Sequence, residues 1–251
     1  MAIPSYLPQQ AHVRAYYALE DVNDGSGNGY NFTNNGPGAF VAAKYDNGWY
    51  CSEDTFDLYV ASNLGIASSN ITALYWVKLD GELGAGVSFI GAQHGNNTTK
   101  VWYYAYYDYN GGARRIFTAR RLYGASVPIV SYTINLGTGW NQLGWSWDGT
   151  DLFVWVNGAE ATSLTTSGNG SSGPSDYARI GSGSGNAIAI YDEIVYWDAA
   201  LSGPEVLQFY NGPVTKGGGF SGFSPWMFMK DAWEKHNKIF KPKGILIPKG
   251  I

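Results

Sequence analysis

The stretch "IYDEIVYWDAALSGPEVLQFYN", residues 190–211, joins a strand pattern to a helix start. Its first half is apolar and aromatic up to Trp197, and it carries two adjacent acids, Asp192 and Glu193. Neighbouring residues of a strand point to opposite faces, so we expect these two carboxylates to be separated. The run predicts a strand over Ala187–Trp197 that closes a scaffold and holds no acid/base pair.

The second half of the stretch predicts one short surface helix. Ser202 is a suitable N-cap, Pro204 suits the first turn, and Glu205 lies near the positive end of the helix dipole. We expect the apolar side chains that follow to pack inward. These are Val206, Leu207 and Phe209.

The composition predicts an all-β protein. The chain of 251 residues has 34 glycines, 19 tyrosines and 10 tryptophans, and only 14% of its residues are charged. Apolar residues recur with a period near two between Gly, Asn, Asp and Ser clusters, which is typical of strands and turns. We therefore predict a two-sheet antiparallel sandwich. Its candidate strands are Ala39–Ala43, Ile71–Leu79, Val87–Ala92, Val101–Tyr109, Arg114–Leu122, Val127–Ile134, Trp140–Trp147, Leu152–Val156, Ala178–Ile180 and Ala187–Trp197.

The clearest local element is a hairpin in "GWNQLGWSWDGTDLFVWVNGAE", residues 139–160. The tetrapeptide Asp148–Asp151 is a turn rich in Gly and Asp, and alternating aromatic residues flank it. A second turn is predicted at Asn157 and Gly158, because both residue types tolerate positive φ.

Four segments, taken in order, resemble the concanavalin A-like, laminin-G-like jelly-roll domains. They are "YALEDVNDGSGNGYNFTNNG", "WNQLGWSWDGTDLFVWVNG", "ARIGSGSG" and "IAIYDEIVYWDAALSGPEVLQFY". The resemblance implies a jelly-roll sandwich of two antiparallel sheets packed face to face. Domains of this family serve as glycan-binding modules, adhesion modules, virion components or spacers, so the likeness implies a fold before it implies a function.

The chain divides into three parts by composition. We expect an N-terminal segment over 1–14, the sandwich over 15–211, and a linker with a C-terminal anchoring arm over 212–251. The arm is basic and amphipathic, and its apolar residues predict docking onto a partner chain, with folding back onto the sandwich as the alternative. The predicted docking residues are Trp226, Met229, Trp233, Phe240, Ile245 and Ile247.

The resemblance also implies a calcium site. In related domains the Asp of the late strand approaches the early Asp-containing turn, which here would join Asp192 to Asp24 and Asn28. Oxygen ligands on a Gly-rich turn suit calcium. The alternative is that Asp24 and Asn28 only shape the turn, while Asp192 accepts hydrogen bonds at a strand end.

The segment "KVWYYAYYDYNGGARRIFTARRLYG", residues 100–124, predicts a carbohydrate-binding surface. Its aromatic residues alternate along a strand, so one row should be core and the other exposed. Exposed rings stack on sugar faces, and arginines bind hydroxyl or acidic groups. The predicted residues are Trp102, Tyr104, Tyr106, Arg114 and Arg120; the alternative is cross-strand packing or a subunit contact.

Charge and targeting signals narrow the function classes. A net charge of -4 predicts no nucleic-acid binding, and we find no signal peptide or membrane span. Without paired carboxylates on one strand face or a histidine triad, we predict no enzyme activity. The favoured hypothesis is a structural or adhesion protein of a virion, most plausibly a bacteriophage capsid decoration or tail component made in the host cytoplasm. It would contact other virion proteins or copies of itself, and host-surface glycans; a free-standing lectin is the alternative and a glycoside hydrolase the weaker third.

Overall fold

The computed structural model describes twelve stretches of the chain. They are residues 3–34, 36, 38–51, 58–66, 70–80, 88–94, 102–110, 113–121, 129–165, 178–181, 183–184 and 188–212. The predicted C-terminal arm lies outside the described residues.

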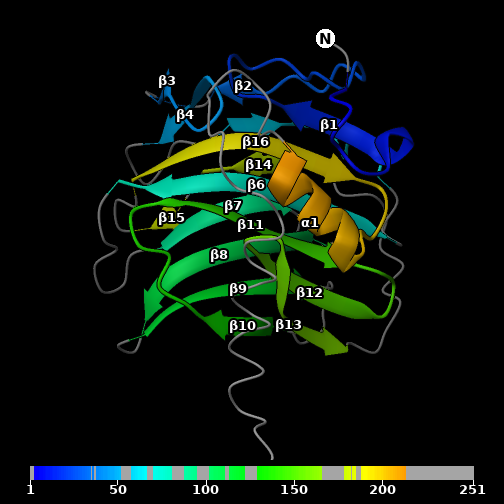
Figure 1. Cartoon of the computed structure of the whole chain (residues 1–251). Helices are drawn as coiled ribbons and strands as arrows, with labels where there is room; N and C mark the ends of the chain where they lie inside the picture. Colours follow the sequence, from blue (N-terminus) through cyan, green and yellow to red (C-terminus); the bar gives the residue numbers. More distant parts are fainter. Residues whose placement is uncertain are drawn as a thin grey trace, which may run out of the picture. The chain divides into compact units, whose positions relative to one another are not determined.

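The described residues form two eight-stranded antiparallel sheets (Figure 1). Sheet I has the strand order β13 (Ala159–Thr165), β12 (Asp151–Val156), β11 (Trp140–Trp147), β6 (Ile71–Leu79), β16 (Ala189–Trp197), β4 (Asn47–Cys51) and β3 (Ala39–Ala42), with β1 (Val13–Tyr17) also paired to β16. Sheet II has the order β10 (Ile129–Thr133), β9 (Ala113–Arg121), β8 (Trp102–Asn110), β7 (Ser88–His94), β14 (Ala178–Ile180), β5 (Leu58–Val60) and β2 (Thr33–Asn34), with β15 (Gly183–Ser184) paired to β7. The prediction of an all-β, two-sheet sandwich of jelly-roll type is confirmed.

All ten strands predicted from the sequence are present, and their ends differ from the predicted ones by at most two residues. The strands that sequence patterning missed are short or lie at an edge. Strand β13, for example, carries no alternating apolar face and is mostly exposed, because it pairs only with β12. Its position follows from the Asn157–Gly158 turn, where both residues have positive φ, 51° and 80°, as predicted.

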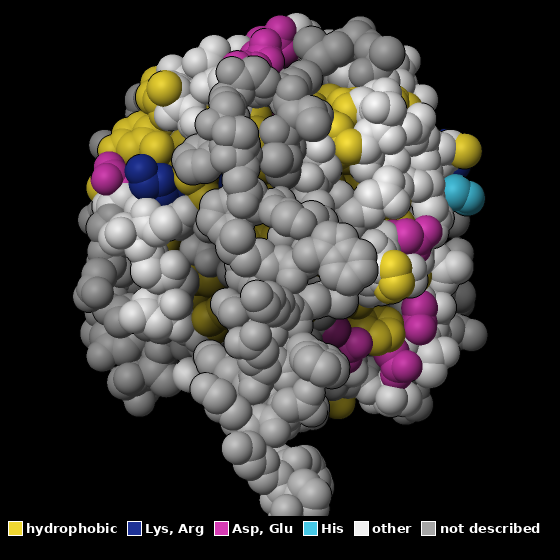
Figure 2. All heavy atoms as spheres, viewed as in Figure 1, with side chains coloured by type: hydrophobic (Ala, Val, Ile, Leu, Met, Phe, Trp, Pro, Cys, Tyr) yellow, Lys and Arg dark blue, Asp and Glu magenta, His cyan; other side chains and the backbone are white. Residues whose placement is uncertain are grey.

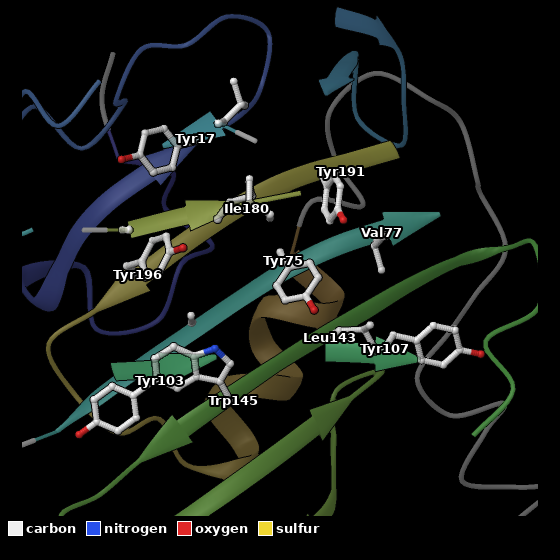
Figure 3. Close-up of a cluster of buried hydrophobic side chains, with 14 of the residues drawn as sticks. Tyr17, Tyr75, Val77, Tyr103, Tyr107, Leu143, Trp145, Ile180, Tyr191 and Tyr196 are labelled. Atoms are coloured by element: carbon white, nitrogen blue, oxygen red, sulfur yellow. The ribbon is translucent and has the colours of Figure 1, made fainter. Parts of the chain in front are cut away.

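An aromatic core fills the space between the two sheets. Strands of both sheets contribute to it, and most of its rings are fully buried (Figure 3). Tyr103 of β8 stacks on Trp145 of β11 with ring centroids 5.1 Å apart, which joins one sheet to the other. The core therefore includes one of the two aromatic rows that the sequence predicted for β8.

A second apolar cluster lies on the outer face of sheet I. It is formed by side chains of β1, β6, β12 and β16 together with residues 3–8 and helix α1 (Gly203–Asn211). We call this the outer cluster; its buried members are Leu7, Val13, Tyr16, Ala18, Leu74, Trp76, Trp155, Val195, Trp197, Leu201, Val206 and Phe209.

Helix α1 begins as predicted. Both the backbone N–H and the hydroxyl of Ser202 donate to Glu205 Oε2, at 2.8 and 2.7 Å. Val206 and Phe209 are buried, but Leu207 is 47% exposed, so the prediction that Leu207 packs inward is wrong. Only one stripe of a short helix faces the sheet, and Leu207 lies next to Val206, off that stripe.

Gly144 marks a close approach between the middle strands of sheet I. A Cβ at this position would collide with the carbonyl oxygen of Ala73 and with Cδ2 of Leu74. We expect Gly144→Ala to destabilise the protein by about 1–3 kcal/mol, the usual cost of overpacking a rigid interior. Urea unfolding measures the change. Gly139→Ala is the matched control, because nothing lies within 4 Å of its Cβ position; equal midpoints for the two variants would contradict the expectation.

Candidate functional site

Strand β16 contains a bulge at the two adjacent acids. Asp192 pairs with Trp76 of β6 and Val195 pairs with Leu74, so three steps along β16 match two along β6. Glu193 occupies the left-handed region, with φ 47°. A bulge breaks the alternation of side chains. The prediction that Asp192 and Glu193 point to opposite faces is therefore wrong.

Both acids belong to the outer face of sheet I. The Tyr6 hydroxyl donates to Glu193 Oε2 at 2.5 Å, and the Tyr45 N–H donates to Asp192 Oδ2 at 2.8 Å. Tyr6 and Tyr45 both pack against the outer cluster. The sequence shows the two acids but not these partners, because Tyr6 lies 187 positions from Glu193 in the chain.

The pair is sealed from solvent. Asp192 is 0% exposed and Glu193 is 1% exposed. Burial, with the charge of Glu193 as the second cause, raises the pKa of Asp192 to about 8, although the backbone N–H groups of Tyr45, Glu193 and Lys44 oppose the shift. Burial also raises the pKa of Tyr6, with Glu193 as the second cause. At neutral pH the geometry favours one proton retained on Asp192.

Lys44 in the β3–β4 turn and Trp76 on β6 lie over the two acids. The Lys44 ammonium lies 3.8 Å from the centroid of the Trp76 ring, a cation–π contact, and Trp76 stacks on Tyr210 at 5.3 Å. Burial lowers the pKa of Lys44, while Asp192 raises it. Among the described residues, neither Asp192 Oδ1 nor Trp76 Nε1 has a hydrogen-bond partner. The cover consists of packed side chains rather than a groove.

This arrangement does not offer a hydrolytic centre. Glycoside hydrolysis needs two carboxyl groups on either side of an accessible sugar, roughly 5 to 9 Å apart. Asp192 and Glu193 converge on one face, but Tyr6, Tyr45 and Lys44 occupy the space above them. What the pair does in the structure is hold residues 3–8 and the β3–β4 turn to the sheet.

The early Asp-containing turn is completed by its own hydrogen bonds. Asp24 Oδ1 accepts from the N–H groups of Tyr16 and Ser26, and Asp24 Oδ2 accepts from the Ser26 hydroxyl and the Tyr30 N–H. The Asn28 side chain donates to the Arg14 carbonyl at 3.0 Å. A hollow of about 290 Å³ lies beside this turn, lined by Ala18, Leu19, Glu20, Asp21, Asn23, Asp24 and Gly25.

The residues predicted to bind calcium take part in separate hydrogen bonds. Asp192 accepts from Tyr45, and Asp24 and Asn28 bond within the turn and to β1. In the described stretches, no three Asp, Glu, His or Cys side chains surround a common point. These bonds account for Asp24 as a turn residue, and the calcium site stays a prediction.

The predicted carbohydrate-binding residues lie on β8 and β9, and their side chains are outside the described set. Tyr103 and Tyr107 are buried in the core, so the core row of β8 is established. Trp102, Tyr104 and Tyr106 hold the alternate positions, across from Arg121, Ala119 and Phe117 of β9. Directly opposite residues of an antiparallel pair share a face.

The register separates the predicted arginines from the predicted aromatic row. Arg120 pairs with Tyr103, and Arg114 pairs with Tyr109. These positions alternate with those of Trp102 and Tyr104. The basic positions that share the aromatic row are Arg121, across from Trp102, and Arg115, across from Asp108. Sequence spacing alone did not reveal this, because it depends on the length of the β8–β9 turn.

The buried histidine has a structural role. His94 is 3% exposed, and its Nε2 lies 3.0 Å from the Asn63 carbonyl oxygen. Burial lowers the pKa of His94 to about 4, with the backbone contact to Asn63 acting in the opposite direction. His12, by contrast, lies at the surface beside Asp198, which also pairs with Arg14. Both histidines tie segments together.

No protein-family model and no curated protein matches this sequence. Solved structures do match. The binding domain of Paraclostridial Mosquitocidal Protein 1 superposes with a TM-score of 0.65 at 13% identity, over 82% of this chain and 53% of that one. The receptor-binding domain of botulinum neurotoxin C/D mosaic serotype gives 0.65 at 11%, over 82% and 52%. The sandwich resembles toxin receptor-binding domains.

A further match is the ligand-binding domain of botulinum neurotoxin serotype D, solved in complex with N-acetylneuraminic acid. Its TM-score is 0.66 at 12% identity, over 82% of this chain and 52% of that one. Identities this low establish the fold alone. The chain spans about half the length of the domains it matches. In the described part of the chain, no helix has the length and apolar character needed to cross a membrane.

The buried acid pair predicts a pH dependence of stability. The folded state keeps the Asp192 proton up to about pH 8, whereas the unfolded chain releases it near the ordinary aspartate pKa of 3.8. The folded state thus binds more protons between these values, so stability from this group falls as pH rises, by on the order of 1 kcal/mol per pH unit. We expect Asp192→Asn to flatten this fall in urea unfolding between pH 4.5 and 8.

Asp46→Asn is the matched control for this experiment. Asp46 is an exposed acid with φ 84°, a conformation that Asn also tolerates. It should keep the wild-type slope. If Asp192→Asn also keeps that slope, Asp192 is not the group that holds the extra proton in the folded state.

A calcium titration separates the two explanations of Asp24. Because four donors lose their acceptor, we expect Asp24→Ala to cost roughly 1–3 kcal/mol, equally with calcium and with a chelator. Thermal melting measures both. A wild-type melting temperature that falls with chelator and recovers with calcium would instead support the predicted metal site.

Proposed function

We propose that this protein is a non-catalytic glycan-binding module. The observation that carries the proposal is the register of β8. Its buried row, Tyr103 and Tyr107, alternates along the strand with the positions of Trp102, Tyr104 and Tyr106. Three aromatic residues spaced two apart on a sheet face are suited to stacking against a chain of sugar rings.

The neighbouring structures support a binding role. They are binding domains of toxins: one was solved in complex with N-acetylneuraminic acid, and for botulinum neurotoxin type C, cell entry depends on interaction with two ganglioside molecules. A sheet sandwich that recognises a surface ligand needs rigid strands and no reactive groups. The sealed state of Asp192 and Glu193 agrees with binding rather than turnover.

The setting of the module is a finer proposal. Display on a virion, with attachment through residues 212–251, rests on the amphipathic pattern of the arm and on the family resemblance. The alternative of a free-standing lectin uses the same sandwich and the same sugar surface. In both alternatives the protein binds glycans without catalysing a reaction.

A glycan array tests the proposal. We expect binding of the full chain to a defined set of glycans, weakened about ten-fold or more by Trp102→Ala or Tyr104→Ala, since each removes one stacking ring. Tyr132→Ala is the control, because Tyr132 is an aromatic residue of the neighbouring strand β10 that is 39% exposed. An array without hits would refute the glycan-binding function. If neither Trp102→Ala nor Tyr104→Ala weakens the hits, the glycan binds at another site.

A further inference from the structure

The outer face of sheet I is covered over only part of its extent. Helix α1 and residues 3–8 cover the part formed by Leu74, Val195 and Trp197 (Figure 1). Toward β3 and β4, at the end of β6 and the start of β16, the described residues leave the same face partly exposed. The solvent face of an antiparallel sheet is usually polar, whereas this uncovered part carries aromatic and aliphatic side chains as well as charged ones.

Four strands place one residue each in a continuous row on this uncovered part. Trp140 of β11 pairs with Lys78 of β6, Lys78 pairs with Ile190 of β16, and Ile190 pairs with Tyr50 of β4. All four are partly exposed. Directly opposite residues share a face, so the four side chains form one stripe. Three strand spacings separate its ends, about 14 Å.

Two polar groups of this row, the Lys78 ammonium and the Trp140 indole N–H, have no ion-pair or hydrogen-bond partner among the described residues. Lys44, the other described lysine, is by contrast packed over Trp76. At the far end, the Tyr50 hydroxyl lies 3.5 Å from Asp80 Oδ2, which is exposed. The row therefore presents an aromatic ring at each end and a free cation between them.

The space-filling view agrees with this arrangement. Figure 2 shows apolar side chains gathered beside a basic and an acidic group on the side of the face where β3, β4 and the ends of β6 and β16 lie. Two flat rings with a cation and an acid acceptor match a ligand that has apolar ring faces, hydroxyl groups and a negative charge.

We propose that the row Trp140–Lys78–Ile190–Tyr50 is a binding site for an oligosaccharide that contains an acidic sugar. Sugar rings lie against Trp140 and Tyr50, the sugar carboxylate pairs with the Lys78 ammonium, and Asp80 accepts from a hydroxyl. This inference rests on the proposed glycan-binding function and adds a second surface, on the sheet opposite to β8. It also names the ligand class, since Lys78 discriminates acidic from neutral glycans.

Direct binding to a matched pair of probes tests the site. The full chain is titrated with 3′-sialyllactose and with lactose, and an array carries further acidic and neutral glycans. We expect a preference for the acidic probe. Lys78→Met keeps the length of the side chain and removes its charge, so it should weaken acidic-glycan binding about ten-fold, the effect of one charge-assisted hydrogen bond.

Two variants keep the result interpretable. Lys44→Met removes the other described lysine and should leave glycan binding unchanged, and Tyr50→Ala should weaken acidic and neutral probes alike. Melting curves establish that each variant is folded. An array without any hit refutes the glycan function and this site with it. Hits that are only neutral, or acidic hits that survive both Lys78→Met and Tyr50→Ala, leave the glycan function standing and refute the row.

Discussion

The pairing of β6 with β16 is the constraint on which the rest of the structure depends. Except at Lys78 and Ile190, both strands are buried on both faces, with the aromatic core on one side and the outer cluster on the other. An antiparallel sheet normally leaves one face to water, so this pair needs a second cover. Residues 3–8 and α1 provide it, through Tyr6 to Glu193 and through the Trp197 indole, which donates to the Pro8 carbonyl at 3.0 Å.

The same double burial explains why two acids in the central strand do no chemistry. A carboxylate taken out of water is costly unless it gains donors or keeps a proton. The bulge at Glu193 turns both acids to the outer face, where Tyr6 and the Tyr45 N–H supply donors. Asp192 meets the remaining cost by holding its proton more tightly. The bulge at Glu193 thus places both acids where they hold residues 3–8 and the β3–β4 turn to the sheet.

The function that we propose depends on what this cover leaves open. Where α1 and residues 3–8 end, the outer face of sheet I shows Trp140, Lys78, Ile190 and Tyr50, and sheet II has its own aromatic row at Trp102, Tyr104 and Tyr106. Both surfaces are rigid because each is built on paired strands rather than loops. Rigid aromatic positions bind a ligand with little loss of conformational entropy, as a recognition module requires.

Local patterns in the sequence were enough to determine the sandwich class, the β11–β12 hairpin, the turn at Asn157 and Gly158, and the start of α1 at Ser202. Each of these depends on residues within a few positions of one another, through period-two alternation, positive φ or a helix cap. Only the tertiary structure decided the bulge at Glu193, the exposure of Leu207, the separation of Arg120 from Trp102, and the row that joins Tyr50 to Trp140. These depend on strand register and on which segment covers which face, and register is set by contacts between residues far apart in the chain, which no local pattern contains.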